Sequence, residues 1–193
     1  TYDLGRPLHV YDADKIKGNL KMRFAKEKET CLTLDEITHE CKSDMIVIAD
    51  NDKLHGIGGV MGGLDSGCSF DTKNVFLEVA LFDPISVTKT GRHLKLQSDA
   101  RYRFERGVDS SSIDWGVQVA TKMIIDLCGG EVSKVVQTNI LEKNIKKINF
   151  NTDKVKSLGG VEISIKEQNN ILKSLGFVVQ EKNNILILTS PSF

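Results

Sequence analysis

The stretch Gln97–Asp109, QSDARYRFERGVD, brings together more charged, hydroxyl-bearing and aromatic side chains than any other part of this 193-residue chain. From residue 100 to residue 105, small or aromatic side chains alternate with charged ones. A period of two is typical of a strand with one apolar and one solvated face. We therefore expect a strand over 100–105, followed by a tight turn at Gly107 and then a helix. Ser98 and Ala100 would lie at the start of that strand, where small side chains on a rigid backbone could select a substrate by its size.

This stretch is flanked by an expected helix on one side and a basic segment on the other. We expect the helix over 111–128, because apolar residues recur every three or four positions and Gly129-Gly130 follows them. Its predicted buried stripe comprises Ile113, Val117, Ala120, Ile124 and Leu127. The basic side chains of the upstream segment 85–96 are Lys89, Arg92, His93 and Lys95. Such a segment is usually a solvated face, but here it is also the best candidate for contact with a phosphate backbone.

The segment 74–82, NVFLEVALF, predicts an apolar strand that is interrupted only by Glu78. A carboxylate in such a run either faces solvent or is buried with hydrogen-bond donors, and the residues alone leave both readings open. The glycine-rich stretch 56–63, GIGGVMGG, fits neither a dinucleotide-binding loop nor a P-loop, because Met61 replaces the third glycine and no Gly-Lys-Ser/Thr follows. We expect its backbone amides to line a pocket without a bound nucleotide.

The amino-terminal part begins with a Gly-Arg-Pro turn, which predicts that His9 and Tyr11 lie on an extended segment. His9 is interpreted either as a packed histidine bonded to a backbone carbonyl or as the edge of an active site. Further along, 20–25 predicts a strand with 30–34 as its candidate partner. The apolar run Met45–Ala49 predicts a strand that is buried on both faces.

The composition limits the class of protein. Lysine plus arginine and aspartate plus glutamate number 26 each, so any contact with nucleic acid requires a local basic patch. Four cysteines without a CxxC pair, and no secretory leader, predict reduced thiols in a cytoplasmic protein. No apolar run is long enough to predict a membrane span. The chain starts at Thr1 and stops at Phe193 without the features of natural termini, which suggests an excised fragment.

A change of composition indicates a second, smaller module. The polar segment 139–147 predicts a linker between a domain over 1–138 and a module over 148–193. In the module we expect a short strand, two short helices, the second capped by Ser164, and a hairpin around Asn183-Asn184. This arrangement resembles a winged helix-turn-helix, but no basic recognition face is evident, and we expect no DNA binding.

Five blocks together resemble a known family: HVYD, GGVMGG, NVFLEVALF, SDARYRFERGVD and CGGEV, in this order and spacing. They resemble the β subunit of bacterial phenylalanyl-tRNA synthetase, in its hydrolytic editing domain and the small helix-turn-helix-like domain that follows. The resemblance covers essentially the whole chain and implies that an amino-terminal portion of the editing domain is missing. It implies an α+β (mixed α/β) fold and hydrolysis of tyrosine wrongly esterified to phenylalanine tRNA, in support of phenylalanyl-tRNA aminoacylation in translation.

The resemblance also implies five site residues. His9 would border the ester and its attacking water, and Glu78 would accept a hydrogen bond from the tyrosine phenol. Gly62 lies in the loop whose backbone lines the ring pocket, and Ser98 and Ala100 lie beside the substrate.

Two residues depart from the family pattern. Ser98 stands where the family usually has threonine, which keeps the hydroxyl and loses a methyl group. Arg101 stands where it usually has serine, and it either alters the rim of the pocket or points outward.

The sequence contains no evident nucleophile–base–acid triad and no metal-ligand cluster. It favours attack by a water positioned by His9 and by the hydroxyls of the tRNA. We expect no metal and no cofactor in this chain, since ATP and magnesium belong to the catalytic subunit. The implied partners are phenylalanine tRNA and the synthetase α subunit, in a heterotetramer, with no membrane.

Two other functions stay open on the sequence. The chain could be a non-catalytic module that docks tRNA or a partner subunit through the basic segment 85–96, with His9 and Glu78 purely structural. It could also be a free-standing esterase for a small molecule.

Overall fold

The computed structural model of the protein describes residues 4–138, 147–182 and 185–192. The chain divides into two compact units, Thr1–Val135 and Val136–Phe193, and each is described by itself. Most of the predicted linker lies outside the described residues, and its last residue, Lys147, begins a strand.

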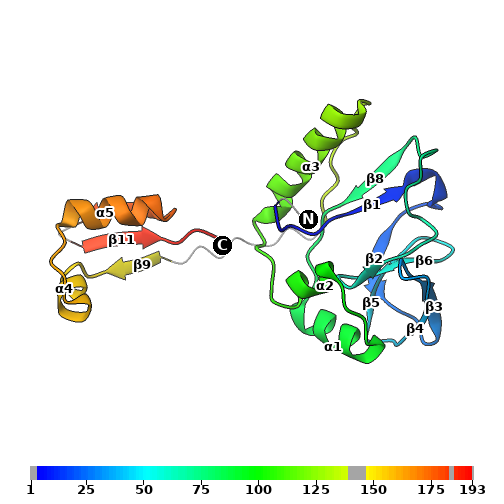
Figure 1. Cartoon of the computed structure of the whole chain (residues 1–193), viewed down its shortest axis with the longest axis horizontal. Coiled ribbons are helices and arrows are strands. Elements are labelled where there is room, and N and C mark those ends of the chain that lie inside the picture. Colours follow the sequence, from blue (N-terminus) through cyan, green and yellow to red (C-terminus); the bar gives the residue numbers. More distant parts are fainter. Residues whose placement is uncertain (1–3, 139–146, 183–184, 193) are drawn as a thin grey trace. The chain divides into compact units, whose positions relative to one another are not determined.

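The first unit is an α+β structure, as predicted. Its strands are β1 (His9–Asp12), β2 (Lys21–Phe24), β3 (Glu29–Leu32), β4 (Thr38–Cys41), β5 (Ile46–Ala49), β6 (Leu54–Ile57), β7 (Met61–Gly62) and β8 (Val75–Glu78). Its helices are the short 3-10 helix η1 (Ala13–Lys15), α1 (Pro84–Leu94), α2 (Asp99–Phe104) and α3 (Ser112–Cys128). The described strands pair in antiparallel fashion as β2-β5-β6-β7, β1-β8 and β3-β4. Figure 1 shows α1 and α2 together beside the sheets, and α3 next to β8.

The core of this unit is centred on β5 and the β6–β7 hairpin. Val47 and Ala49 are fully buried, which confirms the strand predicted at Met45–Ala49. The hairpin that follows packs its backbone against α1. A Cβ on Gly59, which has φ +70°, would lie 2.8 Å from a methyl group of Val87. Glycine therefore serves both the turn and the close approach.

The expected pairing of 20–25 with 30–34 is wrong. β2 pairs with β5, and β3 pairs with its neighbour in sequence, β4. The β3–β4 loop closes locally, because the Thr33 hydroxyl donates a hydrogen bond to Asp35 and Glu36 takes a positive φ of 63°. Because the loop is short and well hydrogen-bonded, closing the β3–β4 hairpin costs less chain entropy than a pairing with a more distant strand.

The strand expected over 100–105 is also wrong, because this segment is the helix α2. Ser98 caps the helix by accepting a hydrogen bond from the backbone N–H of Arg101 at 3.0 Å. Arg101 and Phe104, three positions apart, are buried, and Glu105 bonds the Arg101 guanidinium at 3.0 Å. Over six residues the alternation fits a strand and a helix nearly as well, and the serine cap decides for the helix.

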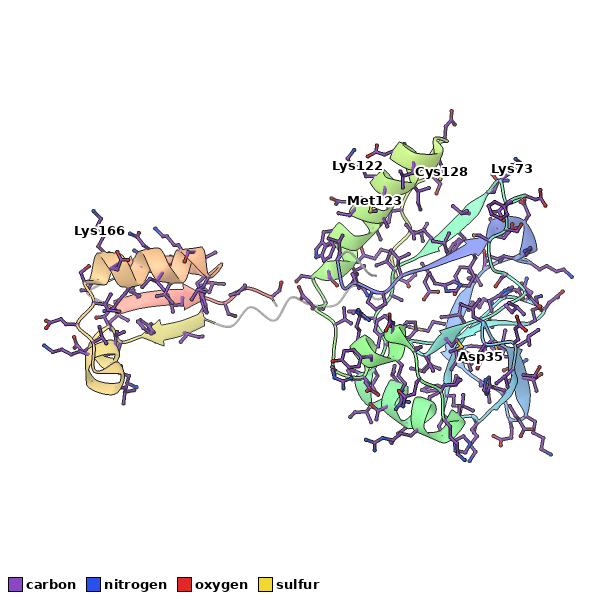
Figure 2. The ribbon with its side chains drawn as sticks, viewed as in Figure 1. Asp35, Lys73, Lys122, Met123, Cys128 and Lys166 are labelled. Atoms are coloured by element: carbon purple, nitrogen blue, oxygen red, sulfur yellow. The ribbon has the colours of Figure 1, made fainter. Side chains whose placement is uncertain are left out.

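The helix expected over 111–128 is confirmed as α3, but its buried side differs from the predicted stripe. Its buried residues are Ser112, Gly116 and Ala120. These small residues let the helix approach the chain after β8, since a Cβ on Gly116 would lie 3.3 Å from Val79. Leu127, predicted to be buried, is 80% exposed. Figure 2 shows other side chains on the exposed carboxyl-terminal half of α3, namely Lys122, Met123 and Cys128.

The second unit contains the elements expected for it. They are β9 (Lys147–Phe150), α4 (Asp153–Gly159), α5 (Ile165–Ser174), β10 (Val178–Lys182) and β11 (Ile185–Thr189), with sheet order β10-β11-β9. Ser164 caps α5 as predicted, accepting a hydrogen bond from the Glu167 backbone N–H at 3.2 Å. β10 and β11 are antiparallel, and the predicted turn at Asn183-Asn184 lies outside the described residues.

The four cysteines are free, and two of them, Cys31 and Cys41, are buried. Within the described residues, no helix is long and apolar enough to cross a membrane.

Candidate active site

A cavity of about 70 Å³ lies in the first unit between β1, the β6–β7 hairpin, β8 and α2. Four of the residues expected at the site line it, one from each of these elements: His9, Gly62, Glu78 and Ala100. The fifth, Ser98, is not part of the lining. Most of the remaining wall is apolar and includes Ile48, Ile57, Val60, Phe82 and Phe104. The structure thus brings residues from distant parts of the sequence to one small apolar space.

His9 lies directly against the backbone of Gly62. A Cβ on Gly62 would overlap the imidazole, 2.7 Å from Nδ1 and 3.1 Å from Nε2. Burial lowers the pKa of His9, which keeps the ring neutral near pH 7. Its Nε2 is buried and has no hydrogen-bond partner among the described residues. Buried polar atoms without a partner are rare, so this nitrogen would gain a hydrogen bond from a water or a substrate that reached it.

Glu78 ends β8 and lies opposite His9 in the β1–β8 ladder. The strand is shorter than the predicted 74–82, since no ladder continues past Glu78. The side chain is half-buried, and its Oε2 accepts a hydrogen bond from the hydroxyl of Tyr11. Tyr11 is 1% exposed, and its ring centroid lies 4.2 Å from that of His9. Of the two readings left open for Glu78, the structure supports the one with an internal donor.

The electrostatics of this pair follow from burial. Burial raises the pKa of Glu78, while the hydrogen bond from Tyr11 and the positive charge of Arg6 oppose the rise. Burial and the neighbouring Glu78 raise the pKa of Tyr11 far above its usual range. The Tyr11 hydroxyl therefore keeps its proton and remains a donor.

Arg6 does not line the cavity but is bonded to two residues that do, Pro7 and Ala80. Its guanidinium donates hydrogen bonds to the carbonyls of Pro7 at 3.0 Å and Ala80 at 2.7 Å. Burial lowers the pKa of Arg6, and the charges of Asp109 and Glu78 raise it. Arg6 thus ties the segment before β1 to the segment after β8 and places a positive charge near the Glu78 carboxylate.

Ser98 and Arg101 act within the helix pair α1–α2. The Ser98 hydroxyl donates a hydrogen bond to the carbonyl of Val60, which fixes the start of α2 to the glycine hairpin. Arg101 is 5% exposed and lies against Gly91 of α1, where a Cβ would be 2.7 Å from its Cζ. It neither forms the cavity rim nor points outward, the two alternatives considered from the sequence. Ala100, on the same helix, does line the cavity.

Sequence reasoning gave no role to Tyr11 or Arg6. The signal for Tyr11 was its spacing of two from His9, which puts both side chains on one face of a strand. The described hydrogen bonds of Arg6 go to backbone carbonyls, and such contacts have no signature in the sequence.

Outside the cavity, α1 exposes the basic segment identified in the sequence. Lys89, Arg92 and Lys95 are exposed, and no carboxylate of the described residues lies within 4.0 Å of their charged groups. Elsewhere in the described part of the chain, no group of three or more His, Cys, Asp or Glu side chains could hold a metal ion.

The cavity suits a small apolar group that carries a hydrogen-bond donor. Its wall is apolar, its carboxylate accepts hydrogen bonds, and a neutral histidine nitrogen stands beside it. Its volume of about 70 Å³ is smaller than the roughly 150 Å³ of a cavity that encloses benzene. An aromatic ring would therefore enter with an outward movement of the wall.

Comparison with known proteins relates the chain to one domain family. Residues 1–129 match the B3/4 domain family. The phenylalanine–tRNA ligase beta subunit of Paramagnetospirillum magneticum is 45% identical over 193 residues, 100% of this chain and 24% of that protein. The beta subunit of Ruegeria pomeroyi is 46% identical over 177 residues, 92% of this chain and 22% of that protein. The chain thus spans about a quarter of the length of these curated relatives.

One solved structure is also similar. It is the crystal structure of an N-terminal fragment of the phenylalanyl-tRNA synthetase beta-subunit from Pyrococcus horikoshii, with a TM-score of 0.49 and 15% identity. The alignment covers 96% of this chain and 54% of that one. The identities to the bacterial beta subunits confirm the resemblance that the five sequence blocks indicated.

Proposed function

The chain belongs to the B3/4 domain family, and from this premise we propose that it carries the editing site of a phenylalanyl-tRNA synthetase β subunit. The reaction is hydrolysis of the ester that joins tyrosine to phenylalanine tRNA. It clears a mistake of aminoacylation and so supports the fidelity of translation. In the whole synthetase, aminoacylation itself belongs to a catalytic α subunit, which uses ATP and magnesium.

One observation carries the proposal: a half-buried carboxylate, Glu78, stands in an apolar cavity opposite His9. A site that separates tyrosine from phenylalanine has to read one hydroxyl. With tyrosine, Glu78 gains a donor. With phenylalanine it gains none and loses water, at a cost of about 1–3 kcal/mol. The cavity therefore favours the wrong amino acid, as an editing site requires.

The hydrolytic step uses a water and no covalent intermediate. Burial keeps His9 neutral, so its Nε2 can hold the attacking water by one hydrogen bond and accept a proton from it. Gly62 leaves the space in which the imidazole stands. The terminal hydroxyls of the tRNA complete the positioning of the water, and the chain needs no cofactor for this step.

The partners of the chain follow from the same proposal. It acts on phenylalanine tRNA in the cytoplasm, as part of a heterotetramer of α and β subunits. The exposed cations of α1 are the part of the described surface best suited to RNA phosphates.

The test is deacylation of tyrosyl- and phenylalanyl-tRNA, with Glu78→Ala as the decisive variant. We expect the preference for tyrosine to narrow by about 1.5–3 kcal/mol, because the variant removes a hydrogen bond to a charged group. The matched control is Glu40→Ala, which removes an exposed glutamate on β4. Unchanged selectivity in Glu78→Ala would remove this residue from the site.

A second candidate function is a non-catalytic module that docks tRNA through α1. The observation that favours it is a set of exposed cations that form no ion pair with any residue the structure describes: Lys89, Arg92 and Lys95. If binding is the main role, the double variant Arg92→Glu/Lys95→Glu weakens tRNA binding and reduces the slope of log K against log salt by about 1 per lost phosphate contact. A chain that binds tRNA through α1 but hydrolyses neither ester would favour this alternative.

A further inference from the structure

The Glu78 carboxylate, which is proposed to bind the hydroxyl of a substrate tyrosine, already accepts a hydrogen bond from a tyrosine hydroxyl of the protein. The Tyr11 phenol donates to Glu78 Oε2 inside the protein, so the chain presents to Glu78 the same chemical group as the substrate. Nothing in the proposed hydrolysis uses Tyr11. Its place on the cavity wall, one strand from Glu78, calls for an explanation of its own.

Tyr11 is fixed more firmly than Glu78. Its ring lies 4.2 Å from His9, 6.2 Å from Phe76 and 6.2 Å from His55, measured between centroids. Its backbone pairs with Phe76 of β8 and also bridges to Gly67. The Tyr11 hydroxyl is therefore a donor at a fixed point in the cavity wall.

Glu78, by contrast, needs a partner to hold its orientation. The terminal torsion of a glutamate is broad, so an unbonded carboxylate rotates freely. An ionised carboxylate accepts at both oxygens, and the Tyr11 bond occupies Oε2. The described hydrogen bonds leave Oε1 without a donor.

We propose that Tyr11 is a positioning residue: its hydroxyl fixes Oε2 of Glu78 so that Oε1 faces the cavity and accepts the hydroxyl of the bound substrate. The inference rests on the proposed function and goes beyond it, because it assigns the discrimination to a pair of residues. Preorganisation of this kind keeps the entropy cost of ordering Glu78 out of the binding step.

The charges around Glu78 agree with this role. The Tyr11 bond opposes the rise in the pKa of Glu78 caused by burial, and so keeps the carboxylate an acceptor. Among the described residues, the other charged or titratable groups that face the pair are His9 on β1, His55 on β6, Cys31 on β3 and Arg6, which also senses Asp109. In Tyr11→Phe, the pKa of Glu78 moves upward, and hydroxyl recognition is lost at a higher pH than in the wild type.

The experiment measures, by NMR titration, the affinities of the full chain and of its Tyr11→Phe variant for two probes, p-cresol and toluene. These two molecules differ by the one hydroxyl that Glu78 is inferred to read. We expect the wild type to bind p-cresol more tightly than toluene. In Tyr11→Phe the ratio of the two affinities should be about tenfold smaller, which corresponds to roughly 1.4 kcal/mol. Toluene binding stays unchanged, because the phenyl ring of the variant fills the same space.

Tyr102→Phe is the matched control, since it removes an exposed tyrosine hydroxyl from α2. The effect of Tyr11→Phe should also vanish in a Glu78→Ala background, and its pH profile should shift upward, neither of which a purely structural role would produce. An unchanged preference in Tyr11→Phe, or a wild type that does not distinguish the probes or binds neither, overturns the inference.

The assay on aminoacyl-tRNA then judges the proposed function separately. Hydrolysis of tyrosyl-tRNA with unchanged selectivity in Tyr11→Phe refutes the inference and leaves the proposed function standing. A probe preference that depends on Tyr11, without hydrolysis of either ester, refutes the proposed function and keeps the role of Tyr11 in orienting Glu78.

Discussion

Asp50 and Glu78 are two carboxylates of the same unit that differ in how many hydrogen-bond donors surround them. The donors to Asp50 are the backbone N–H groups of Lys17, Asp52 and Lys53, at 2.7 to 2.8 Å. His55 Nε2 lies 2.8 Å from its Oδ2, and both of these side chains are 0% exposed. Glu78 has one described donor, the Tyr11 hydroxyl, and it borders a cavity.

The difference shows how the fold separates a structural carboxylate from one available for binding. Burial raises the pKa of both groups, but at Asp50 the backbone N–H groups and His55 outweigh burial and depress the pKa well below its usual range. At Glu78 the hydrogen bond from Tyr11 and the charge of Arg6 do not outweigh the effect of burial, so the pKa of Glu78 stays above its usual value. A carboxylate with all its acceptor sites filled holds a loop in place, and one with a site to spare can bind a ligand.

The largest effect is expected at Asp50. Asp50→Ala leaves three backbone N–H groups without their acceptor and removes the carboxylate that lies 2.8 Å from the buried Nε2 of His55. We expect the free energy of unfolding to fall by about 3–5 kcal/mol, as for other broken buried pairs. Urea unfolding followed by the fluorescence of Trp115 measures this, because the chain has one tryptophan and it lies in α3 of the same unit.

The control is Asp52→Ala, because the Asp52 side chain is 52% exposed and its ion pair with Lys17 lies at the surface. Its loss should change the stability by less than about 1 kcal/mol. If Asp50→Ala were as stable as Asp52→Ala, the contrast between the two carboxylates would fail.

Ala100→Trp should affect activity more than stability. The indole would fill the cavity, whose lining includes Glu78 but not Asp50. We expect hydrolysis of tyrosyl-tRNA to disappear, with a strain of about 1–3 kcal/mol from overpacking. Tyr102→Trp, at an exposed position of the same helix, is the control and should retain activity. A folded Ala100→Trp protein that still hydrolyses tyrosyl-tRNA would place the site elsewhere.

Gly62→Ala tests the other side of the same cavity. The added methyl group overlaps the imidazole of His9, which must move. A displacement of about 1 Å in a positioning group can reduce a rate by roughly a hundredfold, so deacylation should slow by one to two orders of magnitude. Gly159→Ala adds a methyl group that meets nothing within 4 Å and should leave the rate unchanged. Equal rates in both variants would exclude a role for His9 at this position.

The last prediction concerns the dependence of stability on pH, for which the two carboxylates should act in opposite directions. Unfolded Asp and Glu titrate near pH 3.9 and 4.3. The pKa of Asp50 is lower when folded, so the unfolded chain binds more protons and the stability rises with pH up to about 4. The pKa of Glu78 is higher when folded, so the stability falls as pH rises from about 4 to that pKa.

Asp50→Asn should therefore make the acid limb of the stability curve shallower without abolishing it, since the pKa values of Asp35 and Asp65 are also lowered. Glu78→Gln should remove the decline above pH 4. Each unit of pKa shift changes the stability by about 1.4 kcal/mol. Urea unfolding between pH 3 and pH 8, with Trp115 fluorescence, resolves both limbs. Variants whose curves run parallel to that of the wild type would contradict the assignment of these limbs.

The sequence by itself determined the features that depend on neighbouring residues. The apolar run at β5, the glycine stop after α3 and the serine cap of α5 are local signals, and each element formed as predicted. The candidate residues His9, Gly62, Glu78 and Ala100 came from blocks of sequence that resemble a family. The structure places all four at one cavity, while their roles remain predictions.

Only the tertiary structure decided the features that depend on residues far apart in the chain. The side chain of Phe104 in α2 reaches the core and packs against Phe82, and this contact, which the short alternation over 100–105 does not contain, buries one face of the helix. Glu78 takes its donor from Tyr11, 67 positions away, because the register of β1 against β8 sets the two side chains on one face. Strand register and donor supply are properties of packed neighbours, so no local pattern in the sequence contains them.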